Sequence, residues 1–390
     1  MAKALASIVS AGCSVFGKRE GLSSRELFVE AFHEALERCP DLDPRRDIKA
    51  SFIGHVYQGY EKQGHLAVAL ADWAGLTPIP STRIENACAS STVALRVAVA
   101  SIAAGFYDIV LVGGAEKLTT LSGIESQDLA NTFLDFPTEQ WNGISFPSVF
   151  AMVARAHMHK YGTTERQMAQ VAVKNLSHGI MNPKAAMRKE LSIEDIMDSR
   201  VISSPIKLQE CTMLTDGACC LIITRADLAE SFTSIPVDII GMGQSHEKIG
   251  LAGRGDLAIP MAAVRAATEA YQMAGVGPEQ IEIAEVHDCF TIGEILAYEA
   301  LGFCEFGDGG KLLEEGATYK DGRIPVNTDG GLKAKGHPVG ATGAAQIYEI
   351  YLQLTEQAGE RQLKNVDIGL AHNIGGNLSS CTVTIMKRRR

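Results

Sequence analysis

The sequence predicts an α/β protein with buried, mostly parallel strands, and three observations carry this prediction. Apolar residues recur at helical spacing in residues 26–39 and again in residues 91–104, where many are alanines. Residues 108–115, Asp-Ile-Val-Leu-Val-Gly-Gly-Ala, form a continuous apolar run that ends in glycines. Such a run is typical of a parallel strand that helices cover on both faces.

An internal repeat extends this prediction to two related halves. Cys88 precedes an alanine-rich segment, and an apolar run with Gly-Gly follows at residues 107–114. His337 precedes another small-residue segment, and a similar run with Gly-Gly follows at residues 366–376. Duplicated halves would place Cys88 and His337 at equivalent helix starts.

The remaining segments divide the chain into three predicted units. Residues 1–16 look like a first strand and turn, and residues 234–236 are the expected crossover between the halves. Residues 119–204 are less regular and predict an inserted helical lobe that carries substrate specificity. The prediction is an N-terminal half of residues 1–118 and 205–233, the lobe, and a C-terminal half of residues 234–390.

Composition excludes several classes of protein. The 390 residues carry a net charge of −10, and the only basic cluster is at residues 387–390, so a nucleic-acid partner is not expected. No apolar stretch approaches the roughly 20 residues that span a bilayer, which predicts no membrane partner and a cytoplasmic protein. The nine cysteines contain no CxxC pair, which favours a reduced compartment and no metal site.

Cys88 is the first residue that could carry chemistry. It stands just before the alanine-rich helix, and the unpaired amides of a helix N-terminus favour a thiolate. The alternative is a small buried hydrophobic residue, and this segment alone favours that alternative.

His337 is the second candidate. Residues 330–343, Gly-Gly-Leu-Lys-Ala-Lys-Gly-His-Pro-Val-Gly-Ala-Thr-Gly, place it between glycines at a helix start, where it could deprotonate a thiol. The alternative is a phosphate-binding loop with an incidental histidine, but the spacing fits neither of the common phosphate-loop motifs.

Two weaker segments complete the set. Residues 284–290 hold His287 and Cys289, which in isolation could form a metal corner, but no partner ligands lie at the usual spacing, so ordinary buried core residues are the default interpretation. Residues 371–377 end a predicted strand in a glycine turn, and such a turn can direct backbone amides at an oxyanion.

Together these four segments resemble the thiolase family. Residues 86–90 look like its nucleophile segment, and residues 336–343 match its GHPxGxxG motif. Residues 287–290, His-Asp-Cys-Phe, are similar to the signature of sterol-carrier-protein-type thiolases and their archaeal relatives. Residues 157–165, 172–179 and 182–183 resemble the same branch. Commoner thiolases carry a second cysteine where this chain has Asn373, and in the His-Asp-Cys-Phe branch Cys289 supplies it.

The resemblance implies a fold and a mechanism. The fold would be two duplicated βαβαβαββ halves in a layered α-β-α-β-α core with an inserted lobe. His337 would take the proton of Cys88, which becomes acylated, and Cys289 would exchange the α-proton of a second acyl group. His337 and a water held by His287 would stabilise the enolate oxygen, and the amides of Cys88 and Gly375 would form an oxyanion hole.

It also implies substrates and binding residues. Acyl-coenzyme A thioesters would be substrates, with no bound cofactor. Thr212 falls where thiolases hold the pantetheine arm, Gly336 belongs to the substrate loop, and Lys333 and Lys335 would either meet coenzyme A phosphates or be solvated. The expected reaction joins two acetyl-CoA into acetoacetyl-CoA for isoprenoid (mevalonate) synthesis. The alternative is degradation of longer 3-ketoacyl-CoAs.

Partners and rival functions follow from the same resemblance. A homodimer or tetramer is expected, and so is a possible complex with hydroxymethylglutaryl-CoA synthase and a small acyl-CoA-binding scaffold protein. A carrier-protein ketoacyl synthase would carry an HGTGT segment, which is absent. Retro-aldol lyases of this branch tend to lack the nucleophile, whereas Cys88 is present. A non-catalytic acyl-CoA-binding scaffold is the remaining alternative.

Overall fold

A computed structural model describes residues 4–57 and 61–390, and its centre is a nine-stranded mixed sheet. The strand order is β3-β2-β4-β7-β1-β8-β11-β10-β9. The first five in this order belong to the N-terminal part of the chain: β1 (Ala6–Cys13), β2 (Ala50–Gly54), β3 (Ser81–Ile84), β4 (Ile109–Glu116) and β7 (Gly217–Thr224). The other four are β8 (Val237–His246), β9 (Ile283–Val286), β10 (Ile368–Gly375) and β11 (Ser380–Arg388).

The predicted duplication appears directly in this order. In the N-terminal half, the spatial order toward the middle of the sheet is β2, β4, β7, β1. In the C-terminal half, the order from the other edge toward the middle is β9, β10, β11, β8, so each strand of one half has an equivalent in the other. Helix α1 (Ser24–Glu37) follows β1 as α9 (Met261–Ala274) follows β8. Helix α4 (Ser90–Ala103) precedes β4 as α13 (Thr342–Leu354) precedes β10. Each half therefore places its small-residue helix in the same position.

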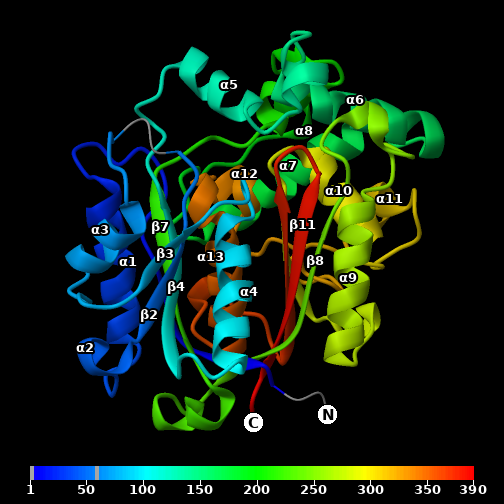
Figure 1. The fold of residues 1–390 in the computed structure, drawn as a ribbon. Coiled ribbons are helices and arrows are strands. Elements are labelled where there is room, and N and C mark those ends of the chain that lie inside the picture. The colour runs from blue at the N-terminus through cyan, green and yellow to red at the C-terminus, as the bar shows by residue number, and fades with distance from the viewer. Residues whose placement is uncertain (1–3, 58–60) are drawn as a thin grey trace.

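The two halves of the sheet and the helices form five layers (Figure 1). Helices α4 and α13 pack against each other between the two halves of the sheet. Helices α1, α2 (Pro44–Asp47) and α3 (Leu66–Trp73) cover one outer face, and α9 covers the other. The predicted α-β-α-β-α arrangement is confirmed. Small residues in α4 and α13 allow the two central helices to approach closely.

The prediction of mostly parallel strands is wrong. The pairs β2–β3, β2–β4 and β9–β10 are parallel, whereas the other five pairs of the large sheet are antiparallel. The misleading feature was burial on both faces, because every residue of β4 and of β7 is buried. Antiparallel strands in a layer between helices are as apolar as parallel ones, so the pattern could not distinguish them.

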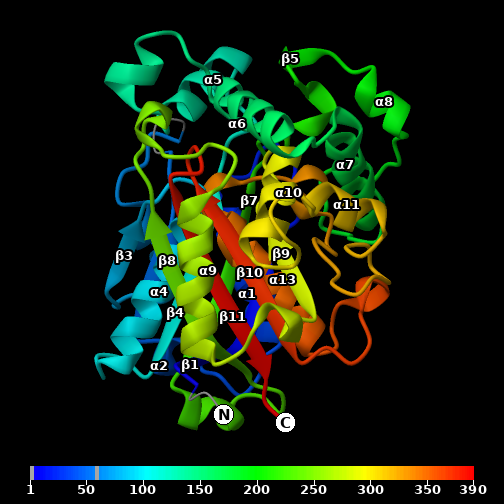
Figure 2. The same cartoon turned by 90° about the vertical axis from the view of Figure 1, so that its right-hand side faces the viewer.

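The lobe lies over one end of the layered core (Figure 2). It contains α5 (Gly123–Asn131), a π-helical turn at Phe136–Gln140, α6 (Phe146–Tyr161), α7 (Glu165–Ile180), α8 (Ile193–Met197) and the short hairpin β5 (Val201–Ser203) and β6 (Ile206–Lys207). Beneath it lie α10 (Thr291–Ala300) and α11 (Gly309–Glu314) (Figure 2), and α12 (Gly331–Lys335), which is labelled in Figure 1 and packs against α7. A stacked ring pair, Phe150 and Phe290 with centroids 4.4 Å apart, joins the lobe to the core.

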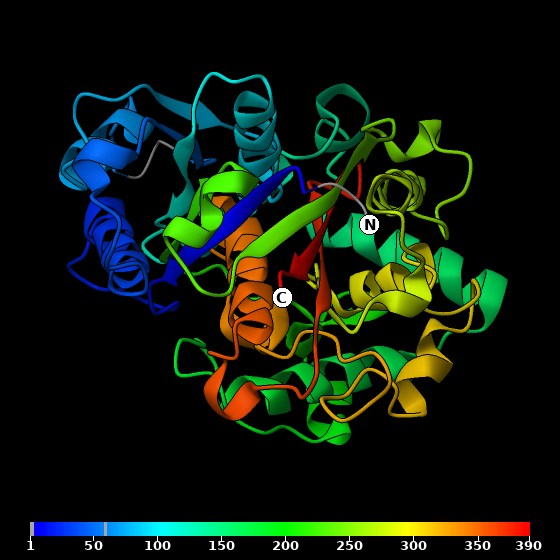
Figure 3. The same ribbon diagram turned by 90° about the horizontal axis from the view of Figure 1, so that it is seen from below.

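Both ends of the described chain lie on the face opposite the lobe (Figure 3). Within residues 4–57 and 61–390, no helix combines the length and the apolar character that a bilayer span requires. The three-unit division of the chain stays a prediction.

Candidate active site

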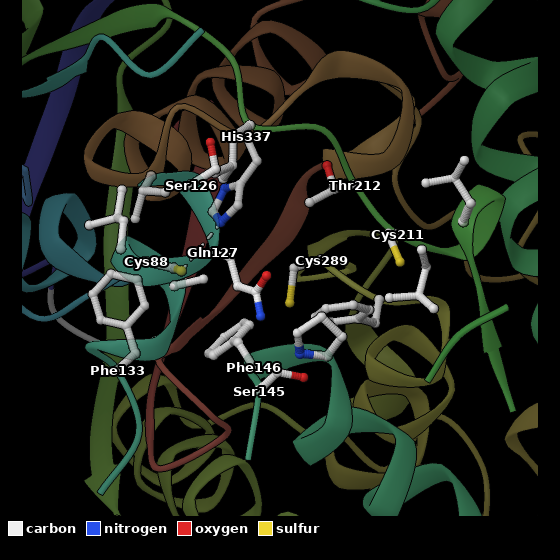
Figure 4. A pocket seen from close by; sticks show the side chains of 18 residues that line it. Cys88, Ser126, Gln127, Phe133, Ser145, Phe146, Cys211, Thr212, Cys289 and His337 are labelled. Carbon is white, nitrogen blue, oxygen red and sulfur yellow. Dashed lines mark hydrogen bonds between the residues drawn. The ribbon is translucent and has the colours of Figure 1, made fainter. Parts of the chain in front are cut away.

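A cavity of about 420 Å³ lies between the lobe and the core (Figure 4). Helix starts and strand ends of both halves meet at its floor, and apolar side chains form most of its wall. Its lining residues are Cys88, Ser126, Gln127, Leu129, Ala130, Phe133, Ser145, Phe146, Pro147, Ile202, Leu208, Cys211, Thr212, Leu214, Cys289, Phe290, His337 and Val339. Three of the four residues predicted to be catalytic, Cys88, His337 and Cys289, therefore share one cavity.

Cys88 and His337 are in direct contact. The Cys88 Sγ lies 3.2 Å from the His337 Nε2, although 249 positions separate the two residues in the sequence. Cys88 lies two residues before α4, and His337 lies five residues before α13. The duplication thus brings the two reactive residues together at equivalent ends of the paired central helices.

Thr342 determines which nitrogen of His337 carries the proton. The His337 Nδ1 lies 2.6 Å from the Thr342 Oγ1, and that hydroxyl donates to the carbonyl of Pro338 at 3.1 Å. Because the hydroxyl proton is directed at Pro338, the oxygen accepts a hydrogen bond from Nδ1–H. The Nε2 atom is then free of hydrogen and can accept the Cys88 proton.

Burial keeps both members of this pair neutral. Burial raises the pKa of Cys88 to about 12, and the charges of Glu116 and Glu85 add to this effect. The amides of Gly376 and of Cys88 itself act in the opposite direction. Burial also lowers the pKa of His337 to about 3. The expectation that the helix start favours a thiolate is therefore not met, because desolvation outweighs the amides.

A thiolate titration checks the neutral pair. Between the ordinary cysteine pKa of 9.0 and the raised value of about 12, Cys88 should remain a thiol, whereas a solvent-exposed cysteine would ionise. The ultraviolet difference spectrum between the wild-type chain and a Cys88→Ala variant should show thiolate absorbance only well above pH 9.0. A thiolate step at neutral pH would instead indicate a cysteine–histidine ion pair.

His287 directs a hydrogen-bond donor toward the same point. Its ring and that of His337 are perpendicular, with centroids 5.3 Å apart. Its Nδ1 lies 3.1 Å from the Nδ2 of Asn373, whose Oδ1 accepts from the Thr92 hydroxyl. Nδ1 therefore accepts, and the proton is on Nε2, which is buried without a partner in the described chain.

This tautomer also bears on metal binding. Ligand atoms of Cys88, His287 and His337 lie within 4.8 Å of one another, which is close enough for a shared ion. A metal would need the lone pair of His287 Nε2, but the Asn373 amide occupies Nδ1 and leaves the proton on Nε2. The donor suits a negatively charged oxygen better than a cation.

Cys289 lies in the loop between β9 and α10 and faces the cavity (Figure 4). Burial raises its pKa well above the ordinary value, with a smaller effect from Cys88, and the Phe290 amide opposes this. In the same loop, the Asp288 carboxylate accepts from the backbone N–H groups of Leu332 and Lys333. This fastens the loop to α12.

The structure directs the amide of Gly376 at the Cys88 sulfur, one residue beyond the predicted Gly375. Gly375 is required at its position for a steric reason. A Cβ atom there would lie 2.7 Å from the Asn86 carbonyl oxygen, so only glycine allows the β10 turn to approach the nucleophile segment.

Of the residues predicted to contact coenzyme A, Thr212 lines the cavity, whereas Lys335 does not. Thr212 lines the cavity, but its hydroxyl donates to the Leu332 carbonyl at 2.5 Å. Gly336 has φ of 112°, and a Cβ there would lie 2.7 Å from the Thr215 hydroxyl.

Lys335 is buried and paired with Asp329, so it neither lines the cavity nor is solvated. Lys333 is also buried, and burial lowers its pKa to about 8. The expectation of phosphate contacts or solvation for these lysines is corrected.

Comparisons with known proteins agree with this architecture. Residues 6–204 match the family described as the thiolase N-terminal domain, and residues 243–388 match the family described as thiolase C-terminal domain-like. An acetyl-CoA acetyltransferase of Methanothermobacter thermautotrophicus is 41% identical over 382 residues, covering 98% of this chain and 99% of that protein. Sterol carrier protein 2 of Bos taurus is 33% identical over 385 residues, covering 94% of this chain and 69% of that protein.

A solved structure, the Ltp2-ChsH2(DUF35) aldolase, shares the fold with a TM-score of 0.85 at 23% identity, covering 99% of this chain and 98% of that one. The chain belongs to the thiolase family. Within that family it is an acyltransferase of the branch that includes sterol carrier protein 2 and the archaeal enzymes.

Three residues of the site escaped the sequence prediction. Thr342 lies inside the recognised motif, and its spacing of five residues from His337 across a turn was the available signal. Asn373 was noted only as a missing cysteine, although a buried amide beside a histidine pattern could have suggested an orienting role. The glycine turn at residues 371–377 indicated an oxyanion contact, but it did not single out the Gly376 amide, because backbone direction at a strand end depends on the pairing of β10 with β11.

Proposed function

We propose that the protein is a thiolase that catalyses reversible thiolysis of 3-ketoacyl-CoA by an acyl-cysteine intermediate, with Cys88 as the nucleophile. The observation that carries the proposal is the 3.2 Å contact between Cys88 Sγ and a neutral His337 Nε2, with Cys289 in the same cavity. Nucleophile, base and second thiol are the three groups that this chemistry requires.

In the first half-reaction, His337 takes the proton of Cys88, and the thiolate attacks the 3-keto carbon. The bond between C2 and C3 breaks, which leaves the acyl group on Cys88 and a carbanion at C2. Cys289 donates its proton to C2, so acetyl-CoA departs when C2 and C3 are those of acetoacetyl-CoA. Protonated His337 then passes the proton that it took from Cys88 to the Cys289 thiolate. The product thus carries the former Cys289 proton, and the Cys88 proton ends on Cys289.

In the second half-reaction, coenzyme A replaces the cysteine. His337 takes the thiol proton of coenzyme A, whose sulfur attacks the acyl carbon. The Cys88 thiolate leaves and recovers the proton from His337. Condensation of two acyl-CoA molecules is the reverse of the same steps.

Two groups of donors would stabilise the charged oxygens. The Nε2–H of His287 is buried, unpartnered and perpendicular to His337, which suits an enolate oxygen either directly or through a water. The amides of Cys88 and Gly376, together with the predicted Gly375, would face the tetrahedral oxyanion at the acyl group.

We propose acetyl-CoA and acetoacetyl-CoA as the substrate pair, in a route toward mevalonate, because two archaeal acetyl-CoA acetyltransferases are 41% and 36% identical to this chain. One observation favours the alternative of longer 3-ketoacyl chains. The cavity is about 420 Å³, and Phe133, Phe146 and Phe290 line it, which leaves apolar space beyond an acetyl group.

Two thiolysis assays test the proposal and separate the alternatives. The purified chain is mixed with free coenzyme A and either acetoacetyl-CoA or 3-ketooctanoyl-CoA, and loss of the enolate absorbance is followed. Faster turnover of acetoacetyl-CoA supports the short-chain assignment, and the opposite order supports the longer one. A folded chain that neither turns over nor becomes acylated on Cys88 would contradict the thiolase proposal and leave the acyl-CoA-binding scaffold.

Thr342→Val is expected to slow acylation of Cys88 by about tenfold to about 100-fold, because a buried Nδ1–H loses its acceptor and the tautomer is no longer held. Thr342→Ser keeps the oxygen and should retain the wild-type rate. Quenched-flow mass spectrometry with acetyl-CoA measures the rate. Equal rates in the valine and wild-type chains would rule out this role.

We further propose a cytoplasmic homo-oligomer, dimer or tetramer. Strand β3 ends the sheet at one edge, and a second copy could pair with it. Light scattering after gel filtration measures the state. A complex with hydroxymethylglutaryl-CoA synthase and a small acyl-CoA-binding scaffold is tested by co-purification from the native source.

A further inference from the structure

A short extended segment, residues 211–215, connects the two loops that carry Cys289 and His337. On one side, the Thr212 amide donates to the Cys289 carbonyl at 3.0 Å. On the other side, the His337 amide donates to the Met213 carbonyl at 3.1 Å. Adjacent residues of one segment therefore hold the backbone of both loops, which lie 48 positions apart in the sequence.

Two side-chain hydrogen bonds, one donated from each segment, reinforce the connection between residues 211–215 and α12. The Thr212 hydroxyl donates to the Leu332 carbonyl at 2.5 Å, and the Lys333 Nζ donates to the Cys211 carbonyl at 3.0 Å. Leu332 and Lys333 belong to α12, which ends at Lys335 just before Gly336 and His337. Each chain segment thus contributes one side chain to the other's backbone.

Besides the bond between the His337 amide and the Met213 carbonyl, the Cys88–His337 pair has contacts of its own. Thr342 fixes the His337 ring, and the Gly340 amide donates to the Glu116 carboxylate at 2.9 Å. Neither contact involves residues 211–215. Loss of the Thr212 hydroxyl leaves these two contacts in place, so it should shift Cys289 more than it shifts the pair.

We propose that Thr212 and Lys333 are positioning residues that hold Cys289 at its working distance from the Cys88–His337 pair. The Thr212 hydroxyl acts on the protein backbone rather than as the anchor of the pantetheine arm. This inference rests on the proposed thiolase function, because it assigns the two thiols to different chemical steps.

The test separates those steps in Thr212→Val. Acylation of Cys88 by acetyl-CoA depends on the pair and should stay within about twofold of wild type. Thiolysis of acetoacetyl-CoA also needs proton transfer by Cys289, so kcat should fall by about tenfold to about 100-fold with KM little changed. Deuterium exchange at C2 of acetyl-CoA, which needs proton transfer by Cys289 but no acylation of Cys88, should fall by the same factor.

Matched variants control for a general loss of stability. Thr355→Val removes another buried hydroxyl that donates to a carbonyl, at 2.7 Å, at the end of α13, and it should leave kcat unchanged. Thr212→Ser should restore turnover, and Lys333→Met should reproduce the valine pattern. If Thr212→Val does not fold, Lys333→Met carries the same test.

Three results would overturn the inference. A raised KM with unchanged kcat in Thr212→Val would make the residue a pantetheine anchor. Wild-type kinetics in both Thr212→Val and Lys333→Met would remove any role, and equal losses of acylation and thiolysis would place the effect on the pair. Failure of the proposed function is different, because the wild-type chain would then show neither acylation nor exchange.

Discussion

Replacing Cys88 with alanine is expected to abolish both thiolysis and formation of the acyl-enzyme. Cys88 is the thiol in contact with His337 Nε2 and with the amides of Gly376 and Cys88 itself. Without it, no other group among the described residues that line the cavity combines a nucleophile, a base at 3.2 Å and an oxyanion hole. Acetoacetyl-CoA thiolysis and intact-mass measurement after exposure to acetyl-CoA check the two losses.

The matched control for this variant is Cys304→Ala. Cys304 is a half-buried free thiol that does not line the cavity, so its loss should leave turnover and the mass adduct intact. An acyl adduct that persists in Cys88→Ala would show that another cysteine is the nucleophile. Turnover without any adduct would contradict the acyl-enzyme mechanism itself.

The second large effect is expected for Cys289→Ala, which should lower thiolysis but leave acylation of Cys88 intact. Loss of a general acid–base group should lower thiolysis by about 10²-fold to about 10⁴-fold. The Cys88–His337 contact remains, so acetyl-CoA should still acylate Cys88 at nearly the wild-type rate. The acyl-enzyme should therefore accumulate, which mass spectrometry detects directly.

Deuterium exchange at C2 of acetyl-CoA provides the second readout for Cys289→Ala. The exchange needs only removal and return of the α-proton, so it should disappear together with thiolysis. Persistent exchange would assign the proton transfer to another group, such as His337. Cys304→Ala again serves as the thiol control, with exchange unchanged.

The duplicated halves explain why short motifs could predict much of this site. Cys88 and His337 each precede a small-residue helix, and the repeat of helix and strand was visible in the residues that follow them. His287 and Cys289 lie on one loop, so their proximity to each other was also local. Resemblance to the thiolase family supplied the step that links these loops, because spacing alone does not bring residues 88 and 337 together.

The incorrect expectations share one physical cause. The strands were predicted to be mostly parallel, Cys88 was predicted to gain thiolate character at its helix start, and Lys335 was predicted to reach solvent or phosphate. In each case the deciding quantity was burial by segments distant in the sequence. Burial hides strand direction, raises the pKa of Cys88 to about 12 and pairs Lys335 with Asp329.

The sequence by itself determined the layered α/β architecture, the four reactive side chains and the glycines that let loops approach one another. These depend on contiguous residues, through helical spacing, backbone freedom and recognisable motifs. Only the tertiary structure decided the proton positions on His337 and His287, the choice of the Gly376 amide and the engagement of Thr212 with Leu332. Hydrogen-bond partners and desolvation arise where separate segments meet, and no local pattern encodes that meeting.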